Sequence, residues 1–222
     1  MRPTYQPGWA VIIPVKPTSV GKSRLDLPTV DRVTLARAIA LDTIAAAAAC
    51  SAVSQVYVVT DDGALIALAF DIPRLRFVPE DDGSGTLRGI DAAVAAGAEA
   101  AGEGMPRAAL LGDLPALRPG DLATALTAAG AHERAAVADA EGTGTTLVTA
   151  RSGIPLSTSF GEGSYGRHLE LGCVALDLAD DSTVRRDVDT AAQLKVAAGL
   201  GLGPRTSGLF AAQTACRPRQ SG

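Results

Sequence analysis

The stretch of sequence that decides the fold reads Ala109-Leu110-Leu111-Gly112-Asp113-Leu114-Pro115-Ala116-Leu117. An apolar run stops there at a glycine and a carboxylate, and the chain then turns at a proline. A short apolar run bounded by turn residues is typical of a strand inside a sheet, and open α/β sheets bind ligands beyond the carboxyl ends of their strands. The stretch therefore predicts that Asp113 lies at the tip of a buried strand, beside a ligand site.

Strands and helices alternate around this stretch. We expect strands over residues 10–15, 55–60, 75–78 and 108–111, and helices over residues 31–49, 64–69, 87–101 and 119–129. This alternation is typical of βαβ units and a mostly parallel sheet. In the second half, a strand pair over 135–138 and 145–149 and an apolar run over 173–178 predict a small antiparallel addition, and a helix over 190–198 closes the fold.

Composition favours one globular α/β domain. The chain has 222 residues, of which 47 % are hydrophobic and 20 % charged, which is enough apolar material for one large core. We assign residues 1–206 to this domain and expect residues 207–222, which lack periodicity, to form a flexible C-terminal tail.

Charge and cysteine content limit the partners. The net charge of -4 gives no reason to expect the concentrated basic face that nucleic acid requires. The most apolar segment is shorter than the ~20 residues of a membrane span, and the first residues lack the pattern of a signal peptide. The three cysteines are too scattered for a disulfide framework. We therefore expect a cytoplasmic protein that binds neither nucleic acid nor membrane.

A cationic loop follows the first predicted strand. Lys16, Gly21, Lys22 and Arg24 lie within nine residues, at the kind of strand-to-helix connection that can hold phosphates. The triplet beginning at Gly21 is not a P-loop, because that motif requires a glycine five residues earlier, where this chain has Lys16. We interpret the loop as a clamp for a polyphosphate; a solvated basic loop is the alternative.

Carboxylates from two distant segments could share a metal ion. Asp113 follows one strand, and Asp187 and Asp189 precede the last predicted helix. Oxygen ligands of this kind suit Mg²⁺, which protein carboxylates and substrate phosphates commonly hold together. The alternative is that Asp189 or Thr190 only caps the helix.

Two glycine-bearing segments could orient a small anion. Residues 142–146 read Gly-Thr-Gly-Thr-Thr, and residues 160–164 read Phe-Gly-Glu-Gly-Ser; both offer hydroxyls and backbone amides. His168 either faces the same pocket or has a structural role. No Ser-His-Asp or Cys-His set is evident, so covalent nucleophilic catalysis is poorly supported.

Together these motifs resemble the CofC/FbiD family, the phosphoenolpyruvate or 2-phospho-L-lactate guanylyltransferases of coenzyme F(420) biosynthesis. The resemblance spans most of the chain. It is carried, in order, by residues 13–16 with 21–25, 112–117, 142–145, 160–161 with Ser164 and His168, and 187–190. At one position the chain departs from the family, because it reads Leu87-Arg88 where the family usually has Leu-Asn.

The resemblance implies a single-domain, Rossmann-like nucleotidyltransferase fold of the glycosyltransferase-A kind. It implies GTP as donor, phosphoenolpyruvate as favoured acceptor, Mg²⁺ as cofactor, and coupling to the next transferase of the F(420) pathway. Carried over by position, it assigns acceptor binding to Thr145, Gly161 and Ser164, metal binding to Asp113, Asp187 and Asp189, nucleotide binding to Lys16, Gly21, Lys22 and Arg24, and catalysis to Asp113 and Lys22.

Several alternatives stay open at this point. The acceptor could be 2-phospho-L-lactate or 3-phosphoglycerate. The enzyme could instead be a molybdenum-cofactor or sugar-phosphate nucleotidyltransferase of the same fold. In a different class, the chain could be a catalytically inactive nucleotide-binding protein, although its intact lysines and aspartates argue against that.

Overall fold

The computed structural model of the chain describes residues 8–16, 30–80 and 89–215. In chain order, its elements are β1 (Trp9–Pro14), α1 (Arg32–Ala49), β2 (Val53–Val59), α2 (Gly63–Leu68), β3 (Leu75–Val78), α3 (Gly89–Ala101), β4 (Arg107–Leu110), α4 (Pro119–Ala129), β5 (Arg134–Ala138), β6 (Thr145–Ala150), α5 (Ser164–Glu170), β7 (Val174–Ala175), the 3-10 helix η1 (Thr183–Arg185), α6 (Ala191–Leu200) and α7 (Pro204–Ala215).

The seven strands form one sheet in the order β3-β2-β1-β4-β6-β5-β7. Strand β6 runs antiparallel to its neighbours β4 and β5, and the other pairings are parallel. The expected mixed sheet is confirmed, including its antiparallel addition. Pro14 is the last residue of β1, where its missing amide does not interrupt the ladder.

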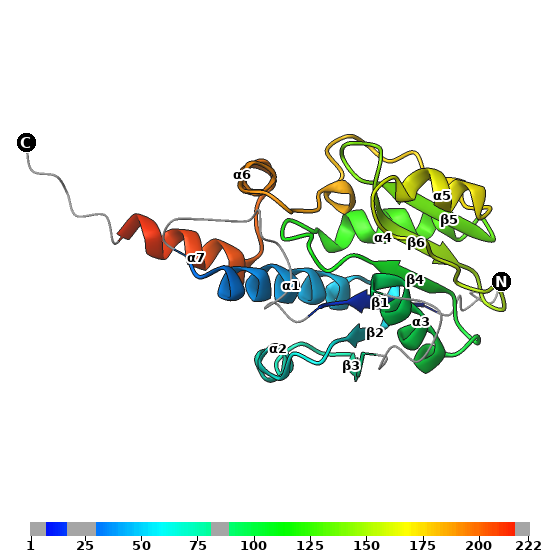
Figure 1. Cartoon of the computed structure of the whole chain (residues 1–222), viewed down its shortest axis with the longest axis horizontal. Coiled ribbons are helices and arrows are strands. Elements are labelled where there is room, and N and C mark those ends of the chain that lie inside the picture. The colour runs from blue at the N-terminus through cyan, green and yellow to red at the C-terminus, as the bar shows by residue number, and fades with distance from the viewer. Residues whose placement is uncertain (1–7, 17–29, 81–88, 216–222) are drawn as a thin grey trace, which may run out of the picture.

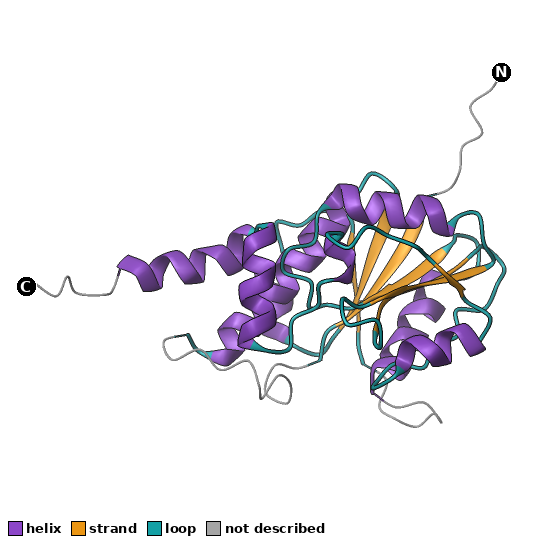
Figure 2. Ribbon diagram, turned by 90° about the horizontal axis from the view of Figure 1, so that it is seen from above, coloured by secondary structure: helices purple, strands orange, loops and turns teal. Residues whose placement is uncertain are grey.

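Helices cover both faces of the sheet (Figure 2). On one face, alternate residues of β1 such as Val11 and Ile13 pack in one cluster with α1 and α4. On the other face, Ala10 and Ile12 pack against α3, while Val148 of β6 packs near Tyr165 of α5. The period-two alternation of a strand thus supplies two apolar faces, and the architecture has three layers.

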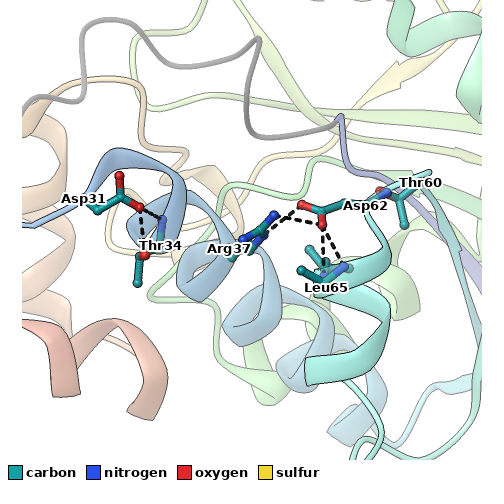
Figure 3. A network of polar contacts seen from close by, with 7 residues as sticks. Asp31, Thr34, Arg37, Thr60, Asp62 and Leu65 are labelled. Atoms are coloured by element: carbon teal, nitrogen blue, oxygen red, sulfur yellow. Dashed lines mark hydrogen bonds and ion pairs between the residues drawn. The ribbon is translucent and has the colours of Figure 1, made fainter.

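Helix α1 is anchored at its start and tied to α2 (Figure 3). Asp31 caps it by accepting hydrogen bonds from the backbone N–H and hydroxyl of Thr34, both at 2.8 Å. Arg37 donates two hydrogen bonds to Asp62, which in turn caps α2 by accepting from the backbone N–H of Leu65. The cap at Asp31 fixes the start of α1, and the ion pair holds α1 against the start of α2.

Residues 207–215 differ from the expected flexible tail, whereas residues 216–222 of that tail lie outside the described residues. Residues 204–215 form α7, which packs along α1 at the end of the molecule that also holds α6 (Figure 1). Asp42, a buried carboxylate in α1, holds the start of this helix by accepting hydrogen bonds from the backbone N–H groups of Arg205 and Thr206 at 3.0 and 2.7 Å. The expected boundary at residue 206 therefore falls inside a helix that a charged side chain caps.

Within the described ranges, every helix is too short or too polar to cross a lipid bilayer.

Candidate active site

The topology brings four chain segments to one edge of the sheet. Strands β4 and β5 both run antiparallel to β6, so their carboxyl ends and the amino end of β6 lie at the same edge. Asp113 follows β4, Asp139 follows β5, and Thr145 begins β6. The backbone N–H of Leu111 donates to the carbonyl of Thr146 at 3.0 Å, which keeps the ends of β4 and β6 in register. The predicted position of Asp113 beyond a buried strand is confirmed.

The backbone around Asp113 is held from both sides. Its carbonyl accepts a hydrogen bond from the N–H of Val188 at 3.0 Å, which brings the segment containing Asp187 to the end of β4. The next residue, Leu114, donates its N–H to the hydroxyl of Thr43 in α1 at 3.0 Å. Gly112 lies against the end of β1, where an added Cβ would be 3.2 Å from the Pro14 carbonyl oxygen. Gly112 is therefore needed for close packing against β1, and it places the half-buried Asp113 at the tip of β4.

Three carboxylates converge beside Asp113. Oxygen atoms of Asp139, Glu141 and Asp187 lie within 4.8 Å of one another. In the part of the chain that the structure describes, the buried Oδ1 of Asp187 has no hydrogen-bond partner. Burial raises the pKa of Asp187 to about 8, and the carboxylates that add to this rise are Asp113, Asp139, Asp189 and Glu141. The site therefore concentrates negative charge that a bound cation would neutralise.

The carboxylates of Asp139 and Glu141 are presented by a tight turn between β5 and β6. Asp139 accepts hydrogen bonds from the backbone N–H groups of Thr143 and Gly144 at 2.9 and 2.7 Å. Gly144 leaves no room for a side chain, since an added Cβ would lie 2.3 Å from Oδ2 of Asp139. The Gly-Thr-Gly-Thr segment is thus a turn folded around an acidic side chain, and it leads directly into Thr145.

Thr145 and Ser164 meet where the turn joins α5. The Ser164 hydroxyl donates to the Thr145 hydroxyl at 3.3 Å, and both side chains are almost fully buried. The backbone N–H of Tyr165 donates to the Thr143 carbonyl at 3.1 Å, which ties α5 to the turn. The sequence prediction that these two hydroxyls share a location agrees with this geometry.

The loop that precedes α5 carries Gly161 and is held by Arg167. The Arg167 guanidinium donates to the carbonyls of Ser159, Phe160 and Glu162. Gly161 has a φ of +117°, which favours glycine, and its Cβ position is 3.5 Å from the Arg167 Nη2. A fixed positive charge therefore lies directly beside the exposed backbone of Gly161.

On the other side of Asp113, Lys16 ends the first described segment. It is exposed, and an added Cβ on Gly89 would lie 3.4 Å from its Nζ, so the ammonium lies near the start of α3. The N-terminus of α3 carries a partial positive charge, and together with the Lys16 ammonium it would favour binding of an anionic group. The other predicted nucleotide-binding residues, Gly21, Lys22 and Arg24, lie outside the described residues, as do Leu87 and Arg88.

The two interpretations of the segment before α6 both find support. Thr190 caps α6 in a capping box with Gln193, as the structural alternative expects. Asp187 instead joins the acidic cluster, and Asp189 lies close enough to add to the rise of its pKa. Sequence reasoning missed Asp139 and Glu141, although a carboxylate directly after an apolar strand is the same signal that singled out Asp113.

Comparison with known proteins agrees with this geometry. Residues 26–168 match the model of the MobA-like NTP transferase domain. A phosphoenolpyruvate guanylyltransferase from Streptomyces scabiei is 50 % identical over 204 residues, which cover 90 % of this chain and 94 % of the relative. One from Sanguibacter keddieii is 45 % identical over 238 residues, covering 90 % of this chain and 83 % of the relative.

The fold also matches solved structures. A protein from Desulfovibrio desulfuricans G20, described as a nucleotide-diphospho-sugar transferase, superimposes with a TM-score of 0.66 at 16 % identity, covering 93 % of this chain and 95 % of its own. At that identity the match supports the fold alone, and it confirms the expected nucleotidyltransferase architecture. With the motifs, the acidic sheet edge and the close relatives in agreement, the chain belongs to the phosphoenolpyruvate guanylyltransferase family, whose members are nucleotidyltransferases with a MobA-like NTP transferase domain.

Proposed function

We propose that this protein transfers GMP from GTP to phosphoenolpyruvate, giving enolpyruvoyl-2-diphospho-5'-guanosine and pyrophosphate in coenzyme F(420) biosynthesis. The observation that carries the choice of substrates is the match over 90 % of the chain to relatives named phosphoenolpyruvate guanylyltransferase. The next transferase of that pathway would consume the product. The buried free thiols of Cys50 and Cys173 fit a reducing compartment and support a cytoplasmic location.

The acceptor needs no protein base in this reaction. A phosphate monoester has its second pKa near ~6, so at neutral pH an oxygen of the phosphoenolpyruvate phosphate is already a nucleophile. It attacks the α-phosphorus of GTP, a new P–O–P linkage forms, and the bond to the β-phosphate oxygen breaks with its electron pair going to pyrophosphate. The protein contributes positioning and charge neutralisation, which dominate phosphoryl-transfer catalysis.

Two groups of residues divide this work. Thr145, Gly161 and Ser164 would hold the acceptor, with the Arg167 charge beside them favouring its anionic groups. Lys16, Gly21, Lys22 and Arg24 would hold the triphosphate of GTP, and Lys22 would neutralise charge as the α-phosphorus reacts. Of these residues, Thr145 begins β6 and Lys16 follows β1, so both lie at the same edge of the sheet as Asp113.

The acidic residues fit a divalent cation, and we propose Mg²⁺. The sequence points to Asp113, Asp187 and Asp189 as its ligands, and the geometry adds Asp139 and Glu141 as candidates around the same Asp187. The donor set consists of oxygen atoms, which Mg²⁺ prefers, and the buried Oδ1 of Asp187 offers a ligand atom that its protein surroundings leave unsatisfied. When bound, Mg²⁺ would neutralise phosphate charge and favour loss of pyrophosphate.

A turnover panel tests the proposal. The purified protein with Mg²⁺ and GTP should release pyrophosphate with phosphoenolpyruvate and do so more slowly with 2-phospho-L-lactate or 3-phosphoglycerate. The next transferase should be included in a parallel reaction, because it would remove a labile or tightly held product. Turnover of a sugar phosphate without turnover of any three-carbon phosphoacid would overturn the proposal.

Asp113 provides a matched test of the metal-binding edge. Asp113→Asn keeps the shape of the side chain but removes its charge, so we expect pyrophosphate release to fall about 100-fold or more while the protein stays folded. Asp181→Asn, at an exposed position, is the control and should retain its rate. A near-normal rate for the Asp113 variant would remove this residue from the site.

A further inference from the structure

His168 is fully enclosed, and both of its ring nitrogens have partners. Its exposed fraction is 0 %. The backbone N–H of Ser159 lies 2.9 Å from Nε2, and the Thr145 hydroxyl lies 2.9 Å from Nδ1. Phe160 packs edge-on against the imidazole, with ring centroids 5.1 Å apart. The ring is therefore locked in position between the Gly161 loop and the start of β6.

These contacts determine which nitrogen carries the proton. A backbone N–H can only donate, so Nε2 must accept from Ser159 and cannot carry a hydrogen. The neutral ring then has its proton on Nδ1, from which it donates to the Thr145 oxygen. A doubly protonated ring would turn an N–H toward the Ser159 N–H. Burial lowers the pKa of His168 to about 4; Asp91 and a hydrogen bond with the Ser164 backbone oppose this fall, and the Arg167 charge adds to it. The ring therefore stays neutral near pH 7.

The tautomer in turn determines what Thr145 can offer a ligand. A hydroxyl oxygen accepts two hydrogen bonds and donates one. The Thr145 oxygen accepts one from His168 and another from the Ser164 hydroxyl at 3.3 Å. Its own hydrogen is then left for a third group. With the opposite tautomer, Thr145 would have to donate to His168, and a lone pair would face any incoming anion.

We propose that His168 is a positioning residue that makes the Thr145 hydroxyl a hydrogen-bond donor toward an anionic oxygen of the acceptor. This inference rests on the proposed function, in which Thr145 binds the three-carbon phosphoacid. His168 does not touch the acceptor and takes no proton from it. Its role is to occupy one lone pair of the Thr145 oxygen, while the Ser164 hydroxyl occupies the other, so that the site presents a donor to a carboxylate or phosphate.

Two isosteric variants separate this role from simple packing. Asparagine can place its amide nitrogen near the position of Nδ1 and donate to Thr145, whereas glutamine places its amide near Nε2 and reaches only Ser159. We expect His168→Gln to raise the KM for phosphoenolpyruvate about 10-fold with the KM for GTP unchanged. His168→Asn should recover most of that loss. Equal KM values for the acceptor in the two variants would contradict the proposal.

A double-mutant cycle with Thr145→Val tests whether the effect passes through the hydroxyl. If it does, His168→Gln should add no further increase in acceptor KM once the hydroxyl is gone. An undiminished additional increase would show that His168 only supports the fold. If Thr145→Val itself leaves the acceptor KM unchanged, the assignment of the acceptor site in the proposed function fails. A Thr145 effect without a His168→Gln effect would overturn the positioning role alone.

NMR spectroscopy of the wild-type protein tests the tautomer of His168 directly and does not require the His168 variants to fold. The chain has two histidines, so ¹⁵N-histidine labelling gives two ring systems, and His132→Gln assigns them. Long-range ¹H–¹⁵N correlation spectra distinguish a protonated Nδ1 from a protonated Nε2. We expect His168 to be protonated at Nδ1 near pH 7 with no dependence on GTP. Protonation at Nε2, or at both nitrogens, would overturn the inference.

Discussion

Replacing Asp187 by asparagine should stabilise the metal-free protein, and the gain should grow as the pH rises. The Asp187 carboxyl is crowded by four other carboxylates that help raise its pKa from 3.8 to about 8. The folded protein therefore keeps the proton to a higher pH than the unfolded chain does. Unfolding releases that proton between these two pKa values, so this group makes the free energy of unfolding fall as the pH rises.

The size of the effect follows from the proton linkage. Each pH unit well inside the window costs about 1.4 kcal/mol. Between about pH 5.5 and 7.5 the wild-type protein should therefore lose about 2.5 kcal/mol of stability relative to Asp187→Asn. The same variant should lose pyrophosphate release, because it lacks a proposed metal ligand.

Urea denaturation in EDTA measures this difference directly. The single tryptophan, Trp9, is buried in β1, so its fluorescence reports the centre of the sheet. Mg²⁺ should raise the wild-type midpoint by ligand linkage and raise that of Asp187→Asn much less. Asp181→Asn, at an exposed position, should follow the wild-type profile. A stability difference between Asp187→Asn and the wild type that stays constant with pH would refute the reasoning.

Two further predictions concern buried polar groups. Asp42→Ala leaves the first backbone N–H groups of α7 without their charged acceptor and should lower the free energy of unfolding by about 3 kcal/mol. The control is Asp71→Ala, which loses an exposed ion pair with Arg205. It should lower the free energy of unfolding by less than about 1 kcal/mol. Because the pKa of His168 falls from 6.5 to about 4 on folding, the unfolded chain takes up this proton first. As the pH falls from about 6.5 to 4, the free energy of unfolding of the wild type should therefore fall by up to about 3 kcal/mol relative to that of His168→Asn. The same urea denaturation assay measures this difference. If the two proteins show parallel dependences of stability on pH, the prediction is wrong.

Local signals were sufficient for much of the fold. Asp31 followed by apolar residues at helical spacing predicted α1, and the cap is present at Thr34. The predicted bounds of β3 and α4 coincide with the observed ones, and the buried strand before Asp113 is β4. In each case the residues that determine the element lie within or next to it, so sequence pattern alone carries the information.

Other features depend on contacts that the sequence pattern does not reveal. The role of Asp42 could not be predicted from local pattern, because it depends on contact with α7, which lies more than 160 residues later in the chain. Sequence reasoning missed the candidate ligands Asp139 and Glu141, because their proximity to Asp187 depends on the pairing of β5 with β6 and on the anchoring of η1. That anchoring comes from Thr183, which donates to Asp121 of α4.

The turn at residues 139–144 connects the two halves of the proposed chemistry. At its start, Asp139 lies in the acidic cluster and uses its carboxylate to fold the turn. At its end, Thr145 receives its hydrogen bonds from Ser164 and His168 of α5. Since the same backbone segment carries both ends, we expect a change in the charge of the cluster to affect the Thr145 hydroxyl as well. Substitutions at the cluster should therefore alter acceptor KM as well as turnover.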